Sequence, residues 1–467
     1  MVVVFVLIAL AVLAALAGLH YYAWRRLVRD TTAGPGWPRR VGTVVFVAGP
    51  VLMFAAVAAE RAGAPFLVQR ILAWPGFLWM AFALYLVLAL LVGEVVRPLL
   101  RRVLDRKAVP SPAAAEAPGS AVDPASAAGA AAPAETTAST RASAPADPAA
   151  PISPQETSPQ ETSPQETSPQ ETPPQETSPQ ETSSQDPAPQ NTAPTRRLLL
   201  ARTVGVAAIV AAAGIVGHGA YGVLRGPKVK RVTVPLARLP RAAHGFRIAV
   251  VSDIHLGPVL GRGFAERVVD TINATQPDLI AVVGDLVDGS VEDLAPAVAP
   301  LARLRARHGT FFVTGNHEYF SGADPWVAHV REIGLRPLEN ARVEMGAFDL
   351  AGVNDISGEN YGEGPDYAKA LGDRDRSRAA VLLAHQPVMI HEAVRHGVDL
   401  QLSGHTHGGQ LWPGNFIADA ANPTLAGLER YGDTQLYVSR GAGAWGPPVR
   451  VGAPSDITVV ELASKQA

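Results

Sequence analysis

The sequence of 467 residues contains no cysteine. That absence excludes disulfide bonds, thiolate metal ligands and a cysteine nucleophile, so any metal ion must be held by His, Asp, Glu or Asn. It does not fix the cellular compartment. An excess of charge of one sign is also lacking, because 40 Lys and Arg residues face 42 Asp and Glu residues. This balance gives no sign of a basic footprint, and no nucleic-acid partner is expected.

Aromatic residues are few, at 6%, yet 48% of the residues are hydrophobic. The hydrophobic residues gather in stretches close to the ~20 residues with which a helix crosses a bilayer. The first stretch has no basic region before it, which favours a retained helix over a secretory signal peptide. We expect four transmembrane helices, at about 1–24, 41–59 and 71–93, and within the segment 196–225.

Lys and Arg cluster after the first and third of these stretches and before the fourth, whereas the loop between the second and third holds only Arg61 and Arg70. Short loops rich in Lys and Arg stay in the cytoplasm. We therefore expect a multi-pass protein of the cell membrane, with the N-terminus and residues 226–467 on the extracytoplasmic side. The pair Arg196-Arg197 also resembles a twin-arginine export signal without its usual Phe and Lys, and a plain positive-inside anchor is the preferred interpretation.

Between the third and fourth stretches the composition changes to Ala, Pro, Ser, Thr and Gln. The segment 108–195 contains a Ser-Pro-Gln-Glu-Thr repeat, seen at 153–157 and again at 158–162. Such a segment has too little apolar surface to offset the entropy lost on ordering. We predict a disordered linker there, between an N-terminal membrane region, 1–107, and the part of the chain that carries the fourth helix and a single domain, 226–467.

Apolar runs of strand length alternate with helix-like segments in 226–467. Alternation of this kind predicts an α/β fold whose sheet strands are buried on both faces. Antiparallel strand pairs are also expected around 343–353 and 435–462. The predicted strands are 247–251, 279–283, 310–313, 379–384 and 398–402, and the predicted helices lie around 265–274, 294–307, 325–333 and 388–395.

A short polar cluster directly follows each of the five predicted strands. The carboxyl ends of strands in an α/β sheet are where sites assemble, so the clusters are expected to converge. Each cluster alone is a weak signal, because an Asp after a strand is often a helix cap and a lone His is often a satisfied buried imidazole. All five together indicate a metal site. They are Asp253-Ile-His255, Gly284-Asp285-Leu-Val-Asp288, Gly315-Asn316-His317-Glu318, Ala384-His385-Gln386-Pro387 and Gly404-His405-Thr-His407.

Taken in this order, the clusters resemble the calcineurin-like metallophosphoesterase superfamily motif by motif, over residues 246–462. The segment 403–410, Ser-Gly-His-Thr-His-Gly-Gly-Gln, and the tail segments 437–443 and 448–450 are similar to its membrane-anchored bacterial branch (YkuE/YaeI-like). One departure is Ser455-Asp456, where that branch usually has Pro-Glu. The resemblance implies a four-layer αββα sandwich and a metal-dependent phosphoric ester hydrolase.

The same resemblance implies a binuclear centre with the carboxylate of Asp285 between two divalent ions. Two ions ~3.5 to 4 Å apart can clamp the attacking and leaving oxygens of an in-line displacement at phosphorus, with a hydroxide held between them as the nucleophile. Nitrogen and oxygen donors without thiolate fit Mn, Fe or Zn better than Ca or Mg. The family pattern gives Asp253, His255 and His407 to the first ion and Asn316, His385 and His405 to the second.

Proton transfer is assigned to His317, because an imidazolium beside the substrate can protonate a leaving alkoxide. An acidic residue orients this histidine in relatives with the motif, and Asp288 holds that place. The alternative for Asp288 is an N-cap of the following helix. Glu318 is expected to be structural.

We expect a membrane-anchored phosphodiesterase that acts on a phosphodiester or pyrophosphate of lipid or cell-envelope material, with membrane lipids around it. A broad phosphomonoesterase or nuclease is a second interpretation, and a sensor or scaffold that only binds metal outside the cytoplasm is a third. No ligand of the implied set is missing, which favours catalysis. The natural substrate, the oligomeric state and any role of the leading helices beyond anchoring do not follow from the sequence.

Overall fold

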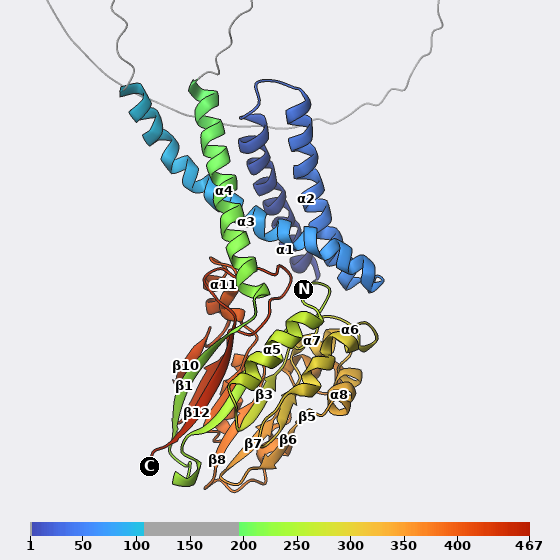
Figure 1. Cartoon of the computed structure of the whole chain (residues 1–467), viewed down its shortest axis with the longest axis vertical. Coiled ribbons are helices and arrows are strands. Elements are labelled where there is room, and N and C mark those ends of the chain that lie inside the picture. Colours follow the sequence, from blue (N-terminus) through green and yellow to red (C-terminus); the bar gives the residue numbers. More distant parts are fainter. Residues whose placement is uncertain (1, 107–195) are drawn as a thin grey trace, which may run out of the picture. The chain divides into compact units, whose positions relative to one another are not determined.

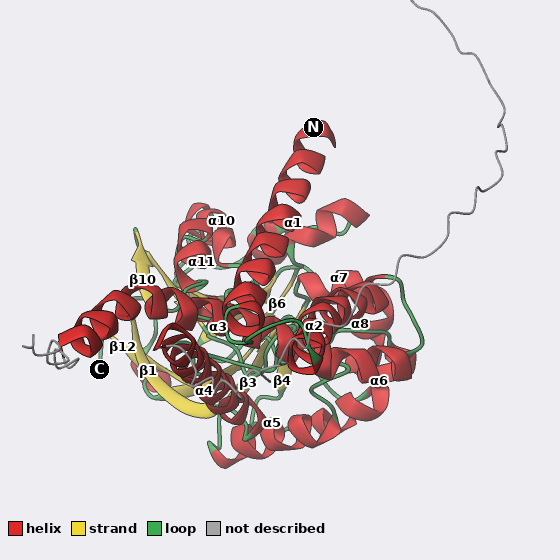
Figure 2. Ribbon diagram, turned by 90° about the horizontal axis from the view of Figure 1, so that it is seen from above, coloured by secondary structure: helices red, strands yellow, loops and turns green. Residues whose placement is uncertain are grey.

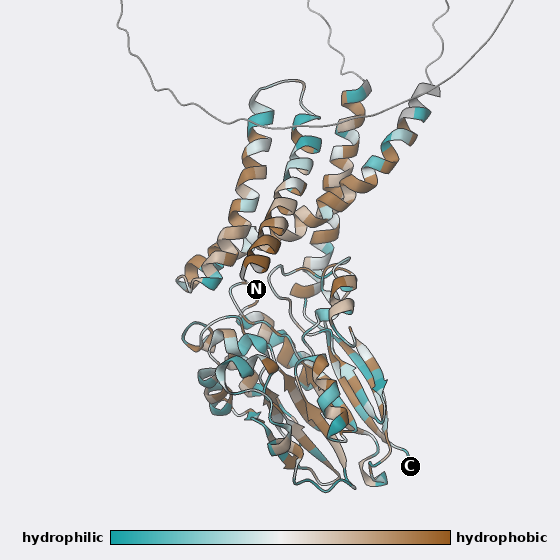
Figure 3. Ribbon diagram, turned by 180° about the vertical axis from the view of Figure 1, so that it is seen from behind, coloured by the Kyte–Doolittle hydropathy of each residue, from teal (hydrophilic) through white to brown (hydrophobic). Residues whose placement is uncertain are grey.

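Four long helices precede the α/β domain in the computed structural model, which describes residues 2–106 and 196–467 (Figure 1). The predicted linker, 108–195, lies outside these described residues. Hydrophobic residues make up most of each helix, and all four are long and apolar enough to cross a membrane (Figure 3). They are α1 (Val2–Trp24), α2 (Trp37–Arg61), α3 (Phe66–Arg106) and α4 (Arg196–Leu224).

Polar contacts hold the helices together near the basic segment that follows α1. Tyr22 donates a hydrogen bond of 3.0 Å to Glu94 in α3, and Arg26 forms an ion pair of 2.8 Å with the same carboxylate. Further along, the indole of Trp79 in α3 fills the space beside Gly49 in α2, where a Cβ atom would clash with it. The loss of a side chain at Gly49 therefore lets α2 and α3 approach closely.

The first of two six-stranded sheets in the domain has the order β1-β12-β2-β3-β4-β5. Its strands pair in parallel, except that β12 runs antiparallel to β2. The central strands are buried along their whole length, as their runs of Val, Ile and Phe predict. The strands are β1 (Lys228–Leu236), β12 (Asp456–Ser464), β2 (Phe246–Val251), β3 (Leu279–Val283), β4 (Thr310–Val313) and β5 (Arg336–Pro337).

The second sheet has the order β10-β11-β9-β8-β7-β6. Its central strands β11, β9, β8 and β7 are parallel, and an antiparallel strand lies at each edge. The strands are β10 (Gly427–Tyr431), β11 (Thr434–Val438), β9 (Leu400–Ser403), β8 (Ala379–Leu383), β7 (Phe348–Gly352) and β6 (Ala341–Glu344).

Helices cover the outer faces of both sheets, which gives the predicted four-layer αββα sandwich. α5, α6 and α8 lie outside β3 and β4 (Figure 2), and their apolar side chains share one core with that sheet. A second core fills the space between the sheets, and a third lies between the other sheet and α9 and α10. The domain helices are α5 (Arg262–Ala274), α6 (Val291–Val298), α7 (Asn316–Ser321), α8 (Ala323–Glu332), α9 (Tyr367–Leu371), α10 (Ile390–Arg395) and α11 (Asn415–Ala421).

Two expectations about local structure need correction. The helix expected over 294–307 ends as α6 at Val298 and continues only as a 3₁₀ turn, since Pro296 and Pro300 interrupt the backbone hydrogen bonding there. The region 435–462 does not form one strand pair. Its two strands, β11 and β12, lie in different sheets, and each finds its antiparallel partner elsewhere.

The core between the sheets yields a stability prediction. Phe348 is 1% exposed, and its ring meets that of Phe246 edge to face at 5.1 Å. Phe348→Ala leaves a cavity and should lower the free energy of unfolding by about 3–5 kcal/mol. Thermal unfolding of the full-length protein in detergent measures this as a fall in Tm. Phe416→Ala is the matched control, because Phe416 is 65% exposed, and an equal fall for both variants would contradict the assigned core.

Candidate metal centre

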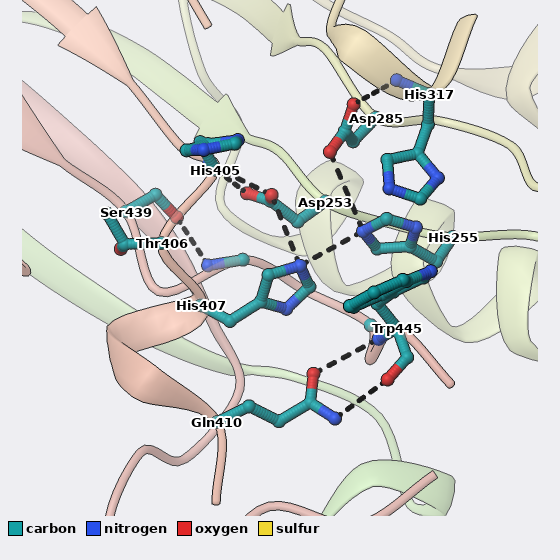
Figure 4. Close-up of polar contacts among 12 residues, drawn as sticks. Asp253, His255, Asp285, His317, His405, Thr406, His407, Gln410, Ser439 and Trp445 are labelled. Carbon is teal, nitrogen blue, oxygen red and sulfur yellow. Dashed lines mark hydrogen bonds and ion pairs between the residues drawn. The ribbon is translucent and has the colours of Figure 1, made fainter. Parts of the chain in front are cut away.

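The nine residues proposed from the sequence meet where the carboxyl ends of the two sheets come together, and Figure 4 labels six of them. The first sheet contributes the loops after β2, β3 and β4, and the second contributes those after β8 and β9. Hydrogen bonds between the sheets hold the two edges together, among them one of 2.9 Å from the backbone N–H of Ala442, after β11, to the carbonyl of Ser252, after β2. The residues are Asp253, His255, Asp285, Asp288, Asn316 and His317 from the first sheet and His385, His405 and His407 from the second.

One group of possible ligands consists of Asp253, His255 and His407, all of them buried. The Nε2 atoms of the two imidazoles lie 3.0 Å apart, and Nε2 of His407 lies 3.4 Å from Oδ1 of Asp253. Three donor atoms thus face one small volume from loops that are about 150 residues apart in the sequence.

A second group consists of Asp285, His385 and His405, with Asn316 beside it. Nδ1 of His405 lies 3.0 Å from Oδ1 of Asn316. Nε2 of His385 lies 3.1 Å from Oδ2 of Asp285, and the same carboxylate oxygen lies 3.8 Å from Nε2 of His255 in the first group. Asp285 is therefore the carboxylate that both groups share.

His385 gives the clearest test of whether the site suits a cation. Its Nδ1 donates a hydrogen bond of 2.9 Å to the carbonyl of Val283, which leaves Nε2 directed into the site. Nε2 is buried and has no hydrogen-bond partner among the described residues, since its approach to Asp285 lacks the alignment of a hydrogen bond. A backbone carbonyl that fixes the tautomer in this way is a common support for a metal-bound imidazole. The donor set thus fits divalent cations.

The carboxylate of Asp288 joins the metal site to His317. It lies 2.7 Å from Nδ1 of His317 and 2.9 Å from Nδ1 of His255. Ser290, and not Asp288, caps the following helix, because its hydroxyl accepts the backbone N–H of Asp293. The helix-cap alternative for Asp288 is therefore wrong. Its carboxylate contacts His317, and it also contacts His255, a possible metal ligand, which the sequence did not reveal.

These contacts set the charge of His317. Burial lowers the pKa of its imidazole, but the hydrogen bond and the negative charge of Asp288 outweigh burial and raise the pKa to about 9. Burial raises the pKa of Asp285, and the imidazoles of His385, His317 and His255 hold it well below its usual range. The site therefore presents Asp285 as an anion and His317 as a protonated imidazole near neutral pH.

Glu318 shapes the loops that carry the ligands. Its carboxylate accepts backbone N–H groups from Asp285 at 3.0 Å, Leu286 at 2.7 Å and Gly315 at 2.6 Å. The backbone N–H of His317 in turn donates to Asp285 at 2.9 Å. Glu318 thus ties the ends of β3 and β4 together, and its role is structural, as the sequence led us to expect.

Backbone strain concentrates at the candidate ligands. A left-handed φ is rare for residues other than Gly and is retained where the surroundings enforce it, often at functional sites. Most of the described non-glycine residues with such a φ belong to this site. The ligands concerned are Asp253 (52°), His255 (48°), Asp285 (52°), His405 (74°) and His407 (52°).

Arg450 is a further site residue, to which the sequence assigned no role. Its guanidinium is buried and donates to the carbonyls of Gly443, His407 and Ala453, and its Nη2 lies 2.9 Å from Nδ1 of His407. Burial lowers the pKa of Arg450 to about 10, so it stays charged. Because a guanidinium only donates, a neutral His407 carries its proton on Nε2, and a cation bound there replaces that proton.

Gln410 and Trp445 form a second feature that the motifs did not reveal. The amide of Gln410 donates to the carbonyl of Trp445 at 2.9 Å and accepts its backbone N–H at 3.1 Å (Figure 4). This clamp places the Trp445 indole 5.7 Å from the imidazole of His317, and the ring of Phe320 lies 5.5 Å from the same imidazole. Aromatic rings therefore frame the proposed proton donor.

Known proteins are similar to this chain over the segment that carries the five motifs. The profile of the calcineurin-like phosphoesterases matches residues 246–409. An uncharacterised metallophosphoesterase of Helicobacter pylori is 37% identical over 274 residues, which cover 58% of this chain and 73% of that protein. A transmembrane protein with a metallophosphoesterase domain from Bos taurus is 39% identical over 287 residues, 57% of this chain and 64% of that protein. The metallophosphoesterase YkuE of Bacillus subtilis is 30% identical over 277 residues, 56% of this chain and 96% of that protein.

The crowding around Asp253 gives a test of the ligand assignment. A Cβ atom on Gly404 would press on the Asp253 carboxylate and lie 2.6 Å from Cβ of Ser252. Gly404→Ala should displace that carboxylate and lower the metal bound per chain, measured by mass spectrometry on full-length protein loaded with Mn and desalted. Gly346→Ala is the control, because a Cβ there meets nothing within 4 Å. Unchanged metal content in Gly404→Ala would argue against Asp253 as a ligand.

Proposed function

The chain belongs to the calcineurin-like metallophosphoesterases, metal-dependent hydrolases of phosphate esters, and on this ground we propose that it hydrolyses a phosphodiester or pyrophosphate of lipid or cell-envelope material at a binuclear centre. The observation that carries the binuclear centre is the position of Asp285. One of its oxygens lies 3.1 Å from His385 in one ligand group and 3.8 Å from His255 in the other, so a single carboxylate can serve two cations.

Each ligand group can hold one divalent ion. The donors are nitrogen and oxygen without thiolate, a set that suits Mn, Fe or Zn. When bound, two such ions lower the pKa of water and offset negative charge on the phosphate. Asp253, His255 and His407 are the proposed ligands of the first ion, Asn316, His385 and His405 those of the second, and Asp285 is shared.

The residues around the proposed ions prepare the second half of the reaction, in which the leaving oxygen takes up a proton. The pKa of His317, raised to about 9, keeps its imidazole protonated at neutral pH. Asp288 holds Nδ1 of that imidazole at 2.7 Å and leaves Nε2 free to face the leaving oxygen. Phe320 and Trp445 flank the ring and limit the access of water to it. We assign His317 as the general acid and Asp288 as its positioning residue.

The reaction is proposed to take place at the bilayer. We propose that α1 to α4 cross it four times and that the domain lies on the extracytoplasmic side. The support is the distribution of charge: Arg25, Arg26 and Arg29 follow α1, and Arg101, Arg102 and Arg106 end α3, which is typical of cytoplasmic ends. A domain held there meets lipid head groups at high local concentration.

The proposed chemistry predicts that hydrolysis of a phosphodiester depends on metal and is lost when the carboxylate of Asp285 is replaced. Full-length protein in detergent, stripped of metal and reloaded with Mn, Zn or Fe, should hydrolyse bis(4-nitrophenyl) phosphate. In Asp285→Asn the shared ligand loses its charge and hydrolysis should fall to background. His391→Ala, which changes an exposed histidine outside the site, is the control. Equal activity with and without metal would refute the proposal.

The role of His317 predicts a dependence on the leaving group. An alkoxide needs a proton in order to leave, whereas 4-nitrophenolate is stable without one. His317→Ala should therefore lower kcat for an alkyl phosphodiester by about 10²–10⁴-fold and for the nitrophenyl ester by much less. Steady-state kinetics on both esters with the loaded enzyme measure the ratio. An equal loss on the two substrates would remove His317 from the role of general acid.

The proposed topology can be tested because the chain has no cysteine of its own. Asp433 lies fully exposed in the domain, and Ala33 is exposed in the segment between α1 and α2. In intact cells a membrane-impermeant maleimide should label Asp433→Cys, and it should label Ala33→Cys only after the membrane is permeabilised. The opposite pattern would place the domain in the cytoplasm.

A further inference from the structure

Hydrogen bonds hold together the last residues of α2 and the turn that leads to α3, a segment (60–65) that we call the α2–α3 turn. The backbone N–H of Ala64 donates to the carbonyl of Ala59 at 2.9 Å, and that of Gly63 donates to the carbonyl of Glu60 at 3.2 Å. The buried side chain of Gln69 donates to the carbonyl of Ala64 at 2.7 Å. These bonds place the side chains of Glu60 and Arg61 at a defined end of α2.

Apolar contacts join this turn to the domain. Phe66, at the start of α3, packs against the core that α5 and α6 share with the first sheet. From the domain, Val259 packs against a cluster formed by Ala56 of α2 with Ala73 and Phe77 of α3. Further along α3, the Tyr85 hydroxyl donates a hydrogen bond of 2.9 Å to a domain carbonyl. The α2–α3 turn therefore rests on the same side of the domain as the loop 257–263.

A cavity of about 490 Å³ lies between this turn and the proposed catalytic pair, Asp288 and His317. Glu60 and Arg61 line it from the turn, and Asp288 and His317 line it from the site. His317 is the proposed proton donor to the leaving oxygen, so the half of the substrate that departs must lie on the side of His317. The cavity is thus the place for the leaving group, and part of its wall comes from the membrane region.

The lining of the cavity has a definite chemistry. The carboxylate of Glu60 has no hydrogen bond or ion pair among the residues that the structure describes, whereas Asp288 and His317 are paired with each other. Phe320, Tyr361 and Trp445 expose aromatic surface to the same cavity. The guanidinium of Arg61 already lies 5.8 Å from the centre of the Phe320 ring, so this rim accommodates a cation. A free carboxylate beside aromatic faces is a combination that binds alkylammonium groups.

We propose that the α2–α3 turn is part of the substrate site and that Glu60, with the aromatic rim of Phe320, Tyr361 and Trp445, binds an amine-bearing leaving group of a phosphodiester. This proposal rests on the proposed function. The reaction adds water across one P–O bond: the water oxygen bonds to phosphorus, the bond to the amino alcohol breaks, and His317 supplies the proton to the departing oxygen. The products are a phosphate monoester and the amino alcohol.

The test compares substrates that differ only in the head group. The full-length protein, loaded with metal, is assayed on vesicles of phosphatidylethanolamine and on vesicles of phosphatidylglycerol. It is assayed in parallel on the soluble pair glycerophosphoethanolamine and glycerophosphoglycerol. The wild type should release ethanolamine in preference to glycerol. Glu60→Gln removes the charge that faces the ammonium group, and it should reduce this preference by on the order of tenfold. A preference in the vesicle pair alone would identify a membrane lipid as the source, and a preference in both pairs would identify the shared head group.

Glu332→Gln is the matched control, because that carboxylate lies on α8, is 75% exposed and is not part of the cavity. It should keep the wild-type preference. Absence of a preference in the wild type, or an unchanged preference in Glu60→Gln, would overturn the proposal even while the nitrophenyl ester is hydrolysed. Failure to hydrolyse any ester, the nitrophenyl ester included, would instead overturn the proposed function.

A second readout does not depend on activity. Ala64 of the turn and Ser290 of the domain line the same cavity. In the cysteine-free chain, a short bis-maleimide should cross-link Ala64→Cys to Ser290→Cys within one molecule. Residues 108–195 lie between these two positions in the sequence. After proteolytic cleavage in that segment, the two fragments of the cross-linked protein should therefore still migrate together on a denaturing gel. The pair Ala64→Cys with Asp433→Cys should not cross-link. Lack of the first cross-link would show that the turn does not face the site.

Discussion

Burial of charge at the junction of the two sheets is the constraint on which the rest of the structure depends. Asp253 is fully buried and Asp285 is 2% exposed, among imidazoles that are nearly as deep. Ionised groups at such depth are tolerated only with opposite charge and hydrogen bonds around them. The surroundings serve this requirement: the backbone N–H of His405 donates to Asp253 at 2.9 Å, that of His317 donates to Asp285 at 2.9 Å, and Arg450 supplies a buried positive charge beside His407.

The membrane region and the domain both contribute residues to the cavity beside His317. Packing of the α2–α3 turn on the domain brings Glu60 to the cavity that His317 lines from the other side. In our proposal the leading helices are more than an anchor, because Glu60 and Arg61 of α2 form part of the wall of this cavity. This arrangement also explains why the rim of the cavity is aromatic, since aromatic side chains tolerate both apolar and polar neighbours.

The five motifs were predictable because strand periodicity and the polar residue after each strand are local signals, and the carboxyl ends of parallel strands share an edge. Other features had no such signal. The strands β1 and β10 lie at sheet edges and carry charged residues, and the separation of β11 from β12 depends on pairing across the domain. Glu60 is an ordinary helix residue in the sequence, and only a contact across more than 200 positions brings it beside Asp288 and His317.

Three residues, Arg225, Gly226 and Pro227, separate the end of α4 from the start of β1. Gly219 in α4 also lies so close to the domain that a Cβ there would be 2.8 Å from the carbonyl oxygen of Arg450. The connection between α4 and the domain is therefore too short to let the domain move far from the end of that helix. In the proposed topology the domain stays at a fixed height above the bilayer and moves by lateral diffusion, so its encounters are confined to a thin layer of the membrane surface. The length of the segment before α4 can vary without widening that layer.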